Sequence, residues 1–418
     1  MLLLSSLLCL PGLLAAYPLD GADQTGIERL VGYRLAQQGE VAGNKLSAGA
    51  QLTLSQVRLH LQEQSGDPML KSDARLSEEM FKLLGDDADN YSVSLLDFTD
   101  PEQPLYAEVN HDQIRNPGSL GKLVVALALL QALADIYPDD MTARERILRS
   151  SMIEADVFIR TDHHKVPFWQ PEHQRLLKRP IIEGDVANFW SYLDWMLSAS
   201  SNAAASMVLK HAMLLSHFGR DYPVSREKEQ AYFTETPKKE LSRALIMLLQ
   251  ESVQRNGLDP DSLRQGGFFS KEGKRRVPGS NSISTTRALM RYLLLIEQGE
   301  LVDPWSSLQL KRLLYMTQRR IRYASAAELS DSALYFKSGS YYKCEAEEGF
   351  ICRKYAGNKL NVMNSVAIVE SPARESRLRY MVAITSNVLR KNSALQHQQL
   401  ATRLHALIRQ QHPDADQQ

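Results

Sequence analysis

The residues of this sequence that could do chemistry are serines, lysines and an asparagine, gathered in three short clusters. The first is Ser119-Leu120-Gly121-Lys122, at the start of an apolar stretch that continues to Tyr137. Residues three apart lie on one face of a helix, so the lysine amine would lie beside the serine hydroxyl. A serine hydroxyl becomes a nucleophile when a base takes its proton, and a lysine amine can do this once burial makes it neutral. We predict that Ser119 is the nucleophile and Lys122 its base, with the helix N-terminus stabilising an oxyanion.

Two other Ser-x-x-Lys pairs in the chain lack this setting. Ser225 and Lys228 lie in a charged stretch that we expect to be a loop, where nothing would bury the lysine. Ser340 and Lys343 lie on a predicted strand, where a spacing of three turns the two side chains to opposite faces. The pair at 119 and 122 alone combines a helical spacing with an apolar environment.

The second and third clusters could bind substrate. Ser200-Ser201-Asn202 lies at a predicted helix junction, where Ser200 could relay a proton and Asn202 could bind a substrate amide. The alternative for these residues is helix capping. Lys337-Ser338-Gly339 lies in an apolar strand, where a fixed positive charge and a hydroxyl could bind a substrate carboxylate. A glycine there lets a substrate backbone approach the strand edge; the alternative is an exposed lysine at a strand bend.

The composition is that of a globular protein with no net charge. Of 418 residues, 44% are hydrophobic, and 49 basic side chains balance 49 acidic ones. No long-range field would attract nucleic acid or anionic lipid. We therefore expect no nucleic-acid partner.

The elements that must position the clusters alternate in type along the chain. The sequence pattern predicts two strands, then helices, then three strands and a last helix. This order favours an α+β (α/β) fold in which an antiparallel sheet is flanked by helices and an all-helical subdomain is inserted. The predicted strands span 91–98, 105–109, 333–342, 362–370 and 378–386; the predicted helices span 120–137, 186–215 with a break at 198–202, 236–254, 287–298 and 395–410.

The N-terminus and the cysteines indicate export. Residues 1–16 are apolar and uncharged, as in a signal peptide, and residues 17–88 are predicted to form a mostly helical lead-in. After removal of the signal we expect no membrane span and a periplasmic or secreted protein. Cys344 and Cys352 would remain, and an even pair in an exported protein predicts a disulfide.

The three clusters in this order resemble the motifs of the serine β-lactamase and penicillin-binding protein superfamily. The predicted helix 287–298, capped by Ser284-Thr285-Thr286 and followed by Gly299, is similar to the class A β-lactamase branch. The resemblance implies a hydrolase domain over 89–418, with insertions near 137–185 and 214–283. It also implies an acyl-enzyme mechanism with no cofactor and no metal, in a monomer that acts on a small-molecule or peptidoglycan-derived substrate. The roles that it implies are acylation for Ser119, general base for Lys122, proton relay for Ser200, amide binding for Asn202, carboxylate binding for Lys337 and Ser338, close approach at Gly339, and an oxyanion hole from the backbone N–H groups of Ser119 and Ser340.

The sequence departs from the class A pattern in two places. It has no E-x-x-L-N motif, whose glutamate activates the deacylating water; Glu272 is the nearest candidate, with a surface role between two lysines as the alternative. The strand 362–370 also lacks the expected arginine. The insertion 137–185 carries two groups of acidic residues and histidines that we expect at the rim of the cleft rather than on a metal: Asp162, His163, His164, Glu172 and His173.

Three functions fit these residues. The first is hydrolysis of a β-lactam or related amide. The second is a D-alanyl-D-alanine carboxypeptidase, which uses the same clusters and needs no such glutamate. The third is a penicillin-binding sensor with little turnover. A Ser-His-Asp hydrolase is disfavoured, because Pro117 stands where the G-x-S-x-G elbow needs its first glycine.

Overall fold

The sheet is built from the most apolar strands of the chain. Its five antiparallel strands are β1 (Tyr91–Asp97), β2 (Leu105–Val109), β9 (Ala333–Lys343), β10 (Leu360–Ser371) and β11 (Leu378–Asn387), in the order β2-β1-β11-β10-β9. Hydrophobic clusters cover both of its faces, which explains the near-continuous apolar runs in the sequence. The predicted strands and the predicted fold class are confirmed. A computed structural model describes residues 20–43, 45–64, 67–316 and 320–416, so the predicted signal peptide lies outside the described residues.

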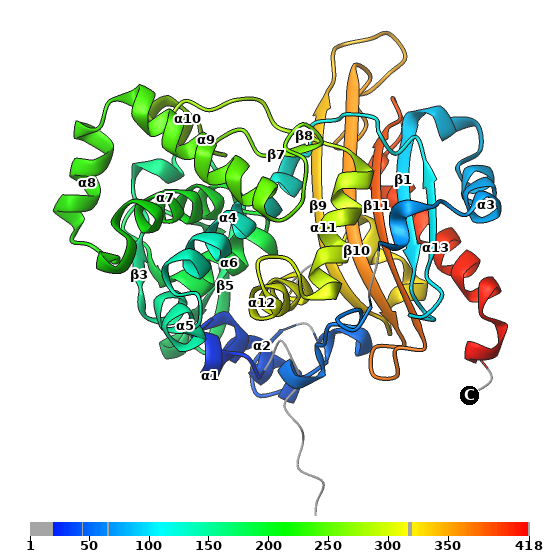
Figure 1. The fold of residues 1–418 in the computed structure, drawn as a ribbon, viewed down its shortest axis with the longest axis horizontal. Helices are drawn as coiled ribbons and strands as arrows, with labels where there is room; N and C mark the ends of the chain where they lie inside the picture. Colours follow the sequence, from blue (N-terminus) through cyan, green and yellow to red (C-terminus); the bar gives the residue numbers. More distant parts are fainter. Residues whose placement is uncertain (1–19, 44, 65–66, 317–319, 417–418) are drawn as a thin grey trace, which may run out of the picture.

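Helices cover both faces of this sheet (Figure 1). Helices α3 (Ala74–Leu84) and α13 (Ser393–Gln411) pack on one face, and α11 (Thr286–Gln298) and α12 (Pro304–Tyr315) on the other. Helix α11 begins as the sequence predicts: the Thr285 side chain accepts a hydrogen bond from the backbone of Ala288. It ends at Gly299, whose φ of 72° is readily adopted by glycine.

The rest of the molecule is a mainly helical region beside the sheet. Its centre is one apolar helix, α4 (Gly121–Ile136), which packs against α6 (Phe189–Leu197), α7 (Asn202–Phe218) and α9 (Lys238–Arg255). This helix is long and apolar enough to cross a membrane, but 72% of the apolar window is buried inside the fold. It is therefore the core helix of this region. The helices around it are α5 (Met141–Ser150), α6 (Phe189–Leu197), α7 (Asn202–Phe218), α8 (Arg226–Glu235), α9 (Lys238–Arg255) and α10 (Lys271–Arg276).

This region is not purely helical. Three two-stranded ladders lie in it: β3 (Met152–Glu154) with β6 (Val186–Asn188), β4 (Lys165–Gln170) with β5 (Arg175–Pro180), and β7 (Leu263–Arg264) with β8 (Ile283–Ser284). The insertion 137–185 thus folds into α5, β3 and the β4–β5 hairpin. The charged stretch after Ser225 is also not a loop, since it forms α8 and the Ser225 hydroxyl caps this helix.

The lead-in is less helical than predicted and is packed into the fold. It contains α1 (Ala22–Thr25), α2 (Arg29–Gln38) and short 3₁₀ turns before α3. Ile27 and Leu30 belong to the main hydrophobic cluster. The buried Arg29 guanidinium makes two hydrogen bonds of 2.5 Å with the carboxylate of Asp194 on α6. The segment is therefore part of the core, which its polar sequence did not indicate.

The predicted disulfide is present. Cys344 and Cys352 are bonded and close the loop that joins β9 to β10. This loop projects beyond the end of the sheet, at the top of Figure 1.

Candidate active site

The nucleophile and base predicted from the sequence lie together at the start of α4. Ser119 is in the 3₁₀ turn Gly118–Leu120, and Lys122 is in the first turn of the helix that follows. The Lys122 Nζ is 2.9 Å from the Ser119 Oγ. A proton can therefore pass directly from the hydroxyl to a neutral amine.

Burial gives Lys122 the protonation state that this transfer needs. Its side chain is fully buried, and its amine also donates to the backbone oxygen of Ser200 at 2.9 Å and to the Asn202 Oδ1 at 2.7 Å. Desolvation lowers the pKa of Lys122 to about 7, against the opposing effect of the Asp162 charge. A substantial fraction of the amine is neutral near neutral pH.

The third cluster, Lys337-Ser338-Gly339, lies on strand β9 of the sheet and contacts the second cluster. The Lys337 Nζ, on β9, donates to the Ser200 Oγ at 2.8 Å, and this hydroxyl lies 3.5 Å from the Lys122 Nζ. Ser200 thus stands between two amines, as a proton relay requires. Burial, with the nearby charges of Lys122 and Arg322, holds the pKa of Lys337 well below its usual value. Lys337 is therefore a weaker source of fixed charge than its sequence position suggests.

Arg322 adds a positive charge beside Ser338 and Ser340, and no motif in the sequence pointed to it. Its guanidinium donates to the hydroxyls of Ser338 at 2.9 Å and Ser340 at 3.1 Å. It lies in a 3₁₀ turn before β9, outside any motif, and its φ of 57° is unusual for a non-glycine residue. Two hydroxyls and a guanidinium are groups that could bind a carboxylate, so Arg322 is a candidate for the role of the arginine that the strand 362–370 was expected to carry.

Two glycines allow β9 to come very close to the nucleophile. A Cβ on Gly339 would be 2.6 Å from the backbone nitrogen of Ser119 and from the Pro117 oxygen. A Cβ on Gly118, whose φ is 54°, would be 3.3 Å from the Ser340 nitrogen. The two amides predicted to form the oxyanion hole therefore lie on segments in direct contact.

A cavity of about 620 Å³ opens beside Ser119 and Asn202. The segment 255–283 forms one wall, with Gln265 and the two residues Phe268 and Phe269. The Lys122 amine lies 4.7 Å from the centre of the Phe269 ring. None of the described residues that line this cavity carries a carboxylate.

Glu272 is engaged elsewhere. Its carboxylate forms ion pairs with Arg275 at 2.6 Å and Arg276 at 2.7 Å, within α10. Hydrogen bonds from Arg275 and Arg276 lower its pKa to about 2, outweighing desolvation. Such a carboxylate is a weak proton acceptor, so the structure gives no support to Glu272 as a deacylation base.

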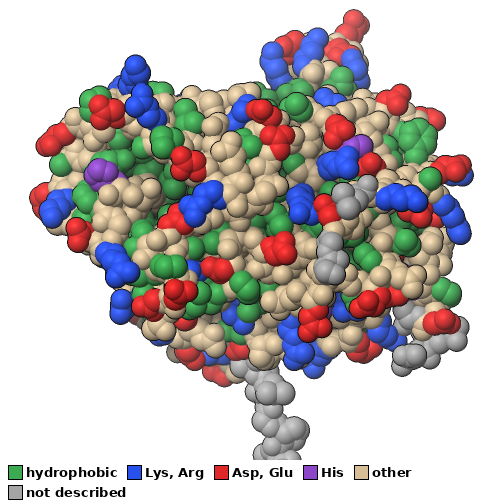
Figure 2. Space-filling view, in the orientation of Figure 1, with side chains coloured by type: hydrophobic (Ala, Val, Ile, Leu, Met, Phe, Trp, Pro, Cys, Tyr) green, Lys and Arg blue, Asp and Glu red, His purple; other side chains and the backbone are tan. Residues whose placement is uncertain are grey.

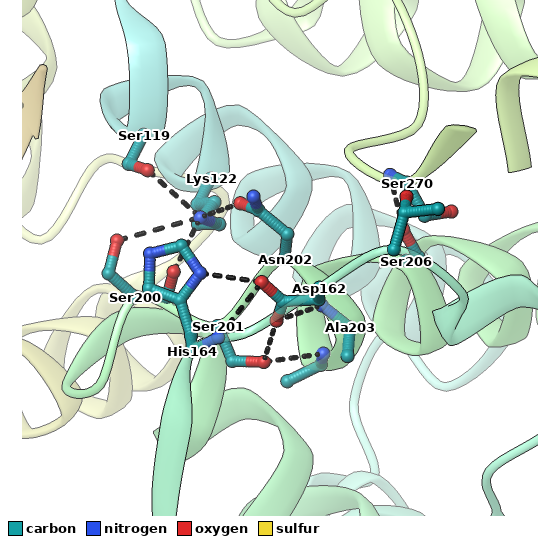
Figure 3. A network of polar contacts seen from close by, with 12 residues as sticks. Ser119, Lys122, Asp162, His164, Ser200, Ser201, Asn202, Ala203, Ser206 and Ser270 are labelled. Atoms are coloured by element: carbon teal, nitrogen blue, oxygen red, sulfur yellow. Dashed lines mark hydrogen bonds and ion pairs between the residues drawn. The ribbon is translucent and has the colours of Figure 1, made fainter. Parts of the chain in front are cut away.

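Asp162 and His164, from the insertion, lie next to the second cluster, Ser200-Ser201-Asn202 (Figure 3). Asp162 accepts hydrogen bonds from the Ser201 hydroxyl at 2.9 Å and from the Ala203 backbone at 2.8 Å. Asp162 is thus a buried support of the site rather than an exposed rim residue. Among the described residues, no group of three or more histidines, cysteines and acidic residues could hold a metal ion.

The fold that carries this site is similar to several solved structures. A point mutant of the penicillin-binding protein PBP-A, solved as an acyl-enzyme complex with penicillin G, matches with a TM-score of 0.51 and 14% identity over 81% of this chain and 98% of that one. A class A β-lactamase from Bacteroides cellulosilyticus DSM 14838 matches with a TM-score of 0.52 and 13% identity, covering 82% and 98% of the two chains. TLA-3 extended-spectrum β-lactamase gives 0.52 and 12%, covering 80% and 98%.

This chain has the fold of class A β-lactamases and PBP-A. No family model matches the sequence, and no curated protein matches it. At 12–14% identity, the likeness to the β-lactamase fold concerns the architecture. The reaction that the site could catalyse depends on its own side chains, above all Ser119, Lys122 and Ser200.

Proposed function

We propose that this protein is an exported serine hydrolase that forms an acyl-enzyme on Ser119. One observation supports this most: the Lys122 amine lies within hydrogen-bond distance of the Ser119 hydroxyl, in surroundings that lower the pKa of Lys122 to about 7. The substrate would be a β-lactam or a related amide that carries a carboxylate. Arg322 and Ser338 would bind that carboxylate, and Asn202 the amide on the acyl side.

In the proposed acylation, neutral Lys122 takes the proton of Ser119 as the serine oxygen attacks the substrate carbonyl carbon. The backbone N–H groups of Ser119 and Ser340 stabilise the oxyanion. The C–N bond then breaks, and the leaving nitrogen takes a proton from the Ser200 hydroxyl. Lys122 returns its extra proton to Ser200, so the proton balance closes and Ser119 is left as an ester.

The cell-wall peptidase alternative draws support from the cavity wall. The segment 255–283, which precedes the threonine-rich cap of α11, contributes a glutamine and aromatic rings there, and no carboxylate. Without a carboxylate to activate water, release of a β-lactam-derived acyl group would be slow. A D-alanyl-D-alanine carboxypeptidase or a penicillin-binding sensor would show this behaviour, with a peptidoglycan-derived partner outside the cytoplasm. The disulfide supports an oxidising compartment.

Mass spectrometry of the intact protein with benzylpenicillin tests the proposal. We expect an adduct of one penicillin on the wild type and none on Ser119→Ala. Ser225→Ala, which changes a Ser-x-x-Lys serine away from the cleft, should label like the wild type. A long-lived adduct favours the peptidase or sensor, and rapid loss of the adduct favours a β-lactamase. A folded wild type that forms no adduct with β-lactams or acyl-D-alanyl-D-alanine peptides would refute the acyl-serine function.

A further inference from the structure

The turn that carries Ser200 and Asn202 contains a non-glycine residue in the left-handed region of backbone conformation. Ser200 has a φ of 59°, which places its backbone oxygen 2.9 Å from the Lys122 amine. Asn202, the first residue of α7, brings its side-chain oxygen to 2.7 Å from the same amine. A left-handed backbone conformation is strained for a non-glycine residue and persists only where its surroundings impose it. Something must therefore hold this turn.

The Asp162 carboxylate holds it from a distant part of the chain. Its side chain is only 4% exposed, and its Oδ2 accepts hydrogen bonds from the Ser201 hydroxyl and the Ala203 backbone. These two donors flank Asn202 in the sequence. A single oxygen thus fixes the residues on both sides of the one that contacts Lys122.

His164 fixes the other oxygen of the same carboxylate. Its Nδ1 lies 2.6 Å from the Asp162 Oδ1, and its ring is 45% exposed at the edge of the site. Burial opposes ionisation of Asp162, but hydrogen bonds from His164 and Ala203 outweigh it and lower the pKa of this carboxyl. Figure 3 shows the carboxylate between the imidazole ring on one side and the Ser201–Ala203 backbone on the other.

We propose that Asp162 is a positioning residue for acylation, which holds the Ser200–Ala203 turn so that Ser200 and Asn202 present their oxygens to Lys122. His164 orients the carboxylate. An aspartate that merely capped α7 would make the same hydrogen bonds to Ser201 and Ala203. Here, however, the capped helix carries Asn202, and the charge of Asp162 acts on the Lys122 amine. This inference rests on the proposed function, because it concerns the same acylation.

Two substitutions separate the charge of Asp162 from its hydrogen bonds. Asp162→Asn keeps the shape of the side chain and removes the charge. Ser201→Ala keeps the charge and removes two hydrogen bonds, the one that Ser201 donates to Asp162 and the one that it accepts from the Ala204 backbone as the N-cap of α7. The measurement is the rate constant for acylation by a fluorescent penicillin as a function of pH. The charged groups that act on the Lys122 amine or are acted on by it are Asp162 and Lys337.

In Asp162→Asn the hydrogen bonds from Ser201 and Ala203 no longer reach a charged oxygen and are weaker, so this variant should be acylated about tenfold or more slowly at its pH optimum. Removing the negative charge also favours neutral Lys122, so the acid limb of the Asp162→Asn profile should move to lower pH. Ser201→Ala should be slower than the wild type, with its acid limb unmoved. His164→Gln should slow acylation, while the matched control His163→Gln, at the exposed neighbouring residue, should not.

Several outcomes would overturn the inference. One is a folded Asp162→Asn with the wild-type rate and acid limb. Another is a lower melting temperature with no change in acylation, which would make Asp162 a purely structural cap. If Asp162→Asn does not fold, wild-type acylation by Ser201→Ala or His164→Gln would be equally decisive. Failure of the wild type itself to form an adduct would instead refute the proposed function.

Discussion

At the scale of single residues, the site depends on amines that are removed from water. Lys122 and Lys337 are both buried, and burial lowers the pKa of each. The Arg322 guanidinium adds a positive charge beside the Ser338 and Ser340 hydroxyls. The structure therefore divides the work between a base, Lys122, and a cation, Arg322.

The pH dependence of acylation follows from this division. The pKa of Lys122 is about 7 and its active form is neutral, so acylation should rise with pH through neutrality and be lost as the amine is protonated at lower pH. Lys122→Ala should reduce the acylation rate constant by about 100-fold or more, since it removes the general base. Stopped-flow labelling with a fluorescent penicillin measures both effects. A flat profile across neutral pH would contradict Lys122 as the base.

A second residue-scale prediction concerns Gly339. Adding a methyl group there would bring it within 2.6 Å of the Ser119 nitrogen and force β9 away from the nucleophile. Displacement of about 1 Å can cost about 100-fold in rate, so Gly339→Ala should acylate about that much more slowly than the wild type. Gly267→Ala, where the added Cβ has its nearest contact at 3.5 Å, is the matched control from the same cavity. Equal rates for the two variants would show that the close approach is unimportant.

At the scale of elements, the sequence predicted the parts that have strong local patterns. The predicted strands 333–342 and 362–370 match β9 and β10 to within two residues at each end, and the capped helix α11 was predicted from periodicity and its cap. The hairpin β4–β5 was missed, because apolar and polar residues do not alternate regularly along its two strands. The three clusters of the candidate site were visible as motifs. Arg322 and Phe269 were not, because only the packing of separate segments brings them to the site.

The loop between β9 and β10 gives a prediction about stability at this scale. A disulfide spanning eight residues should stabilise the protein by about 2–3 kcal/mol, by restricting the unfolded chain. Replacing Cys344 and Cys352 together by serine should lower the unfolding free energy by this amount, as measured by denaturation in urea. Penicillin labelling should persist, because the bridge lies beyond the strand segment that faces Ser119. A reducing agent should destabilise the wild type and leave the double variant unchanged; an equal effect on both would contradict the prediction.

At the scale of the whole molecule, the charged side chains are dispersed over the surface. The candidate active site lies between the sheet and the helical region. Figure 2 shows basic and acidic side chains interspersed over the visible face, in keeping with the zero net charge. The candidate active site lies where the sheet and the helical region meet, with Lys337 from β9 and Lys122 from α4. Its geometry therefore depends on the packing of the two halves against each other. The lead-in contributes to this packing, because Arg29 on α2 donates both to Asp194 on α6 and to the backbone oxygen of Met316, which follows α12.

The Arg29–Asp194 pair tests how far the fold depends on the lead-in. The two side chains are 3% and 0% exposed, and Asp194 lies on α6, which ends shortly before the Ser200–Ala203 turn. Arg29→Met would leave the Asp194 carboxylate buried without this partner, which typically costs about 3–5 kcal/mol. Denaturation in urea should show a loss of this size, and penicillin labelling should fail at temperatures where the wild type still reacts. The double variant Arg29→Met with Asp194→Leu should recover much of the lost stability, because no charge is then stranded. If Arg29→Met instead matched the wild type in stability, the lead-in would be an accessory to the fold rather than part of its core.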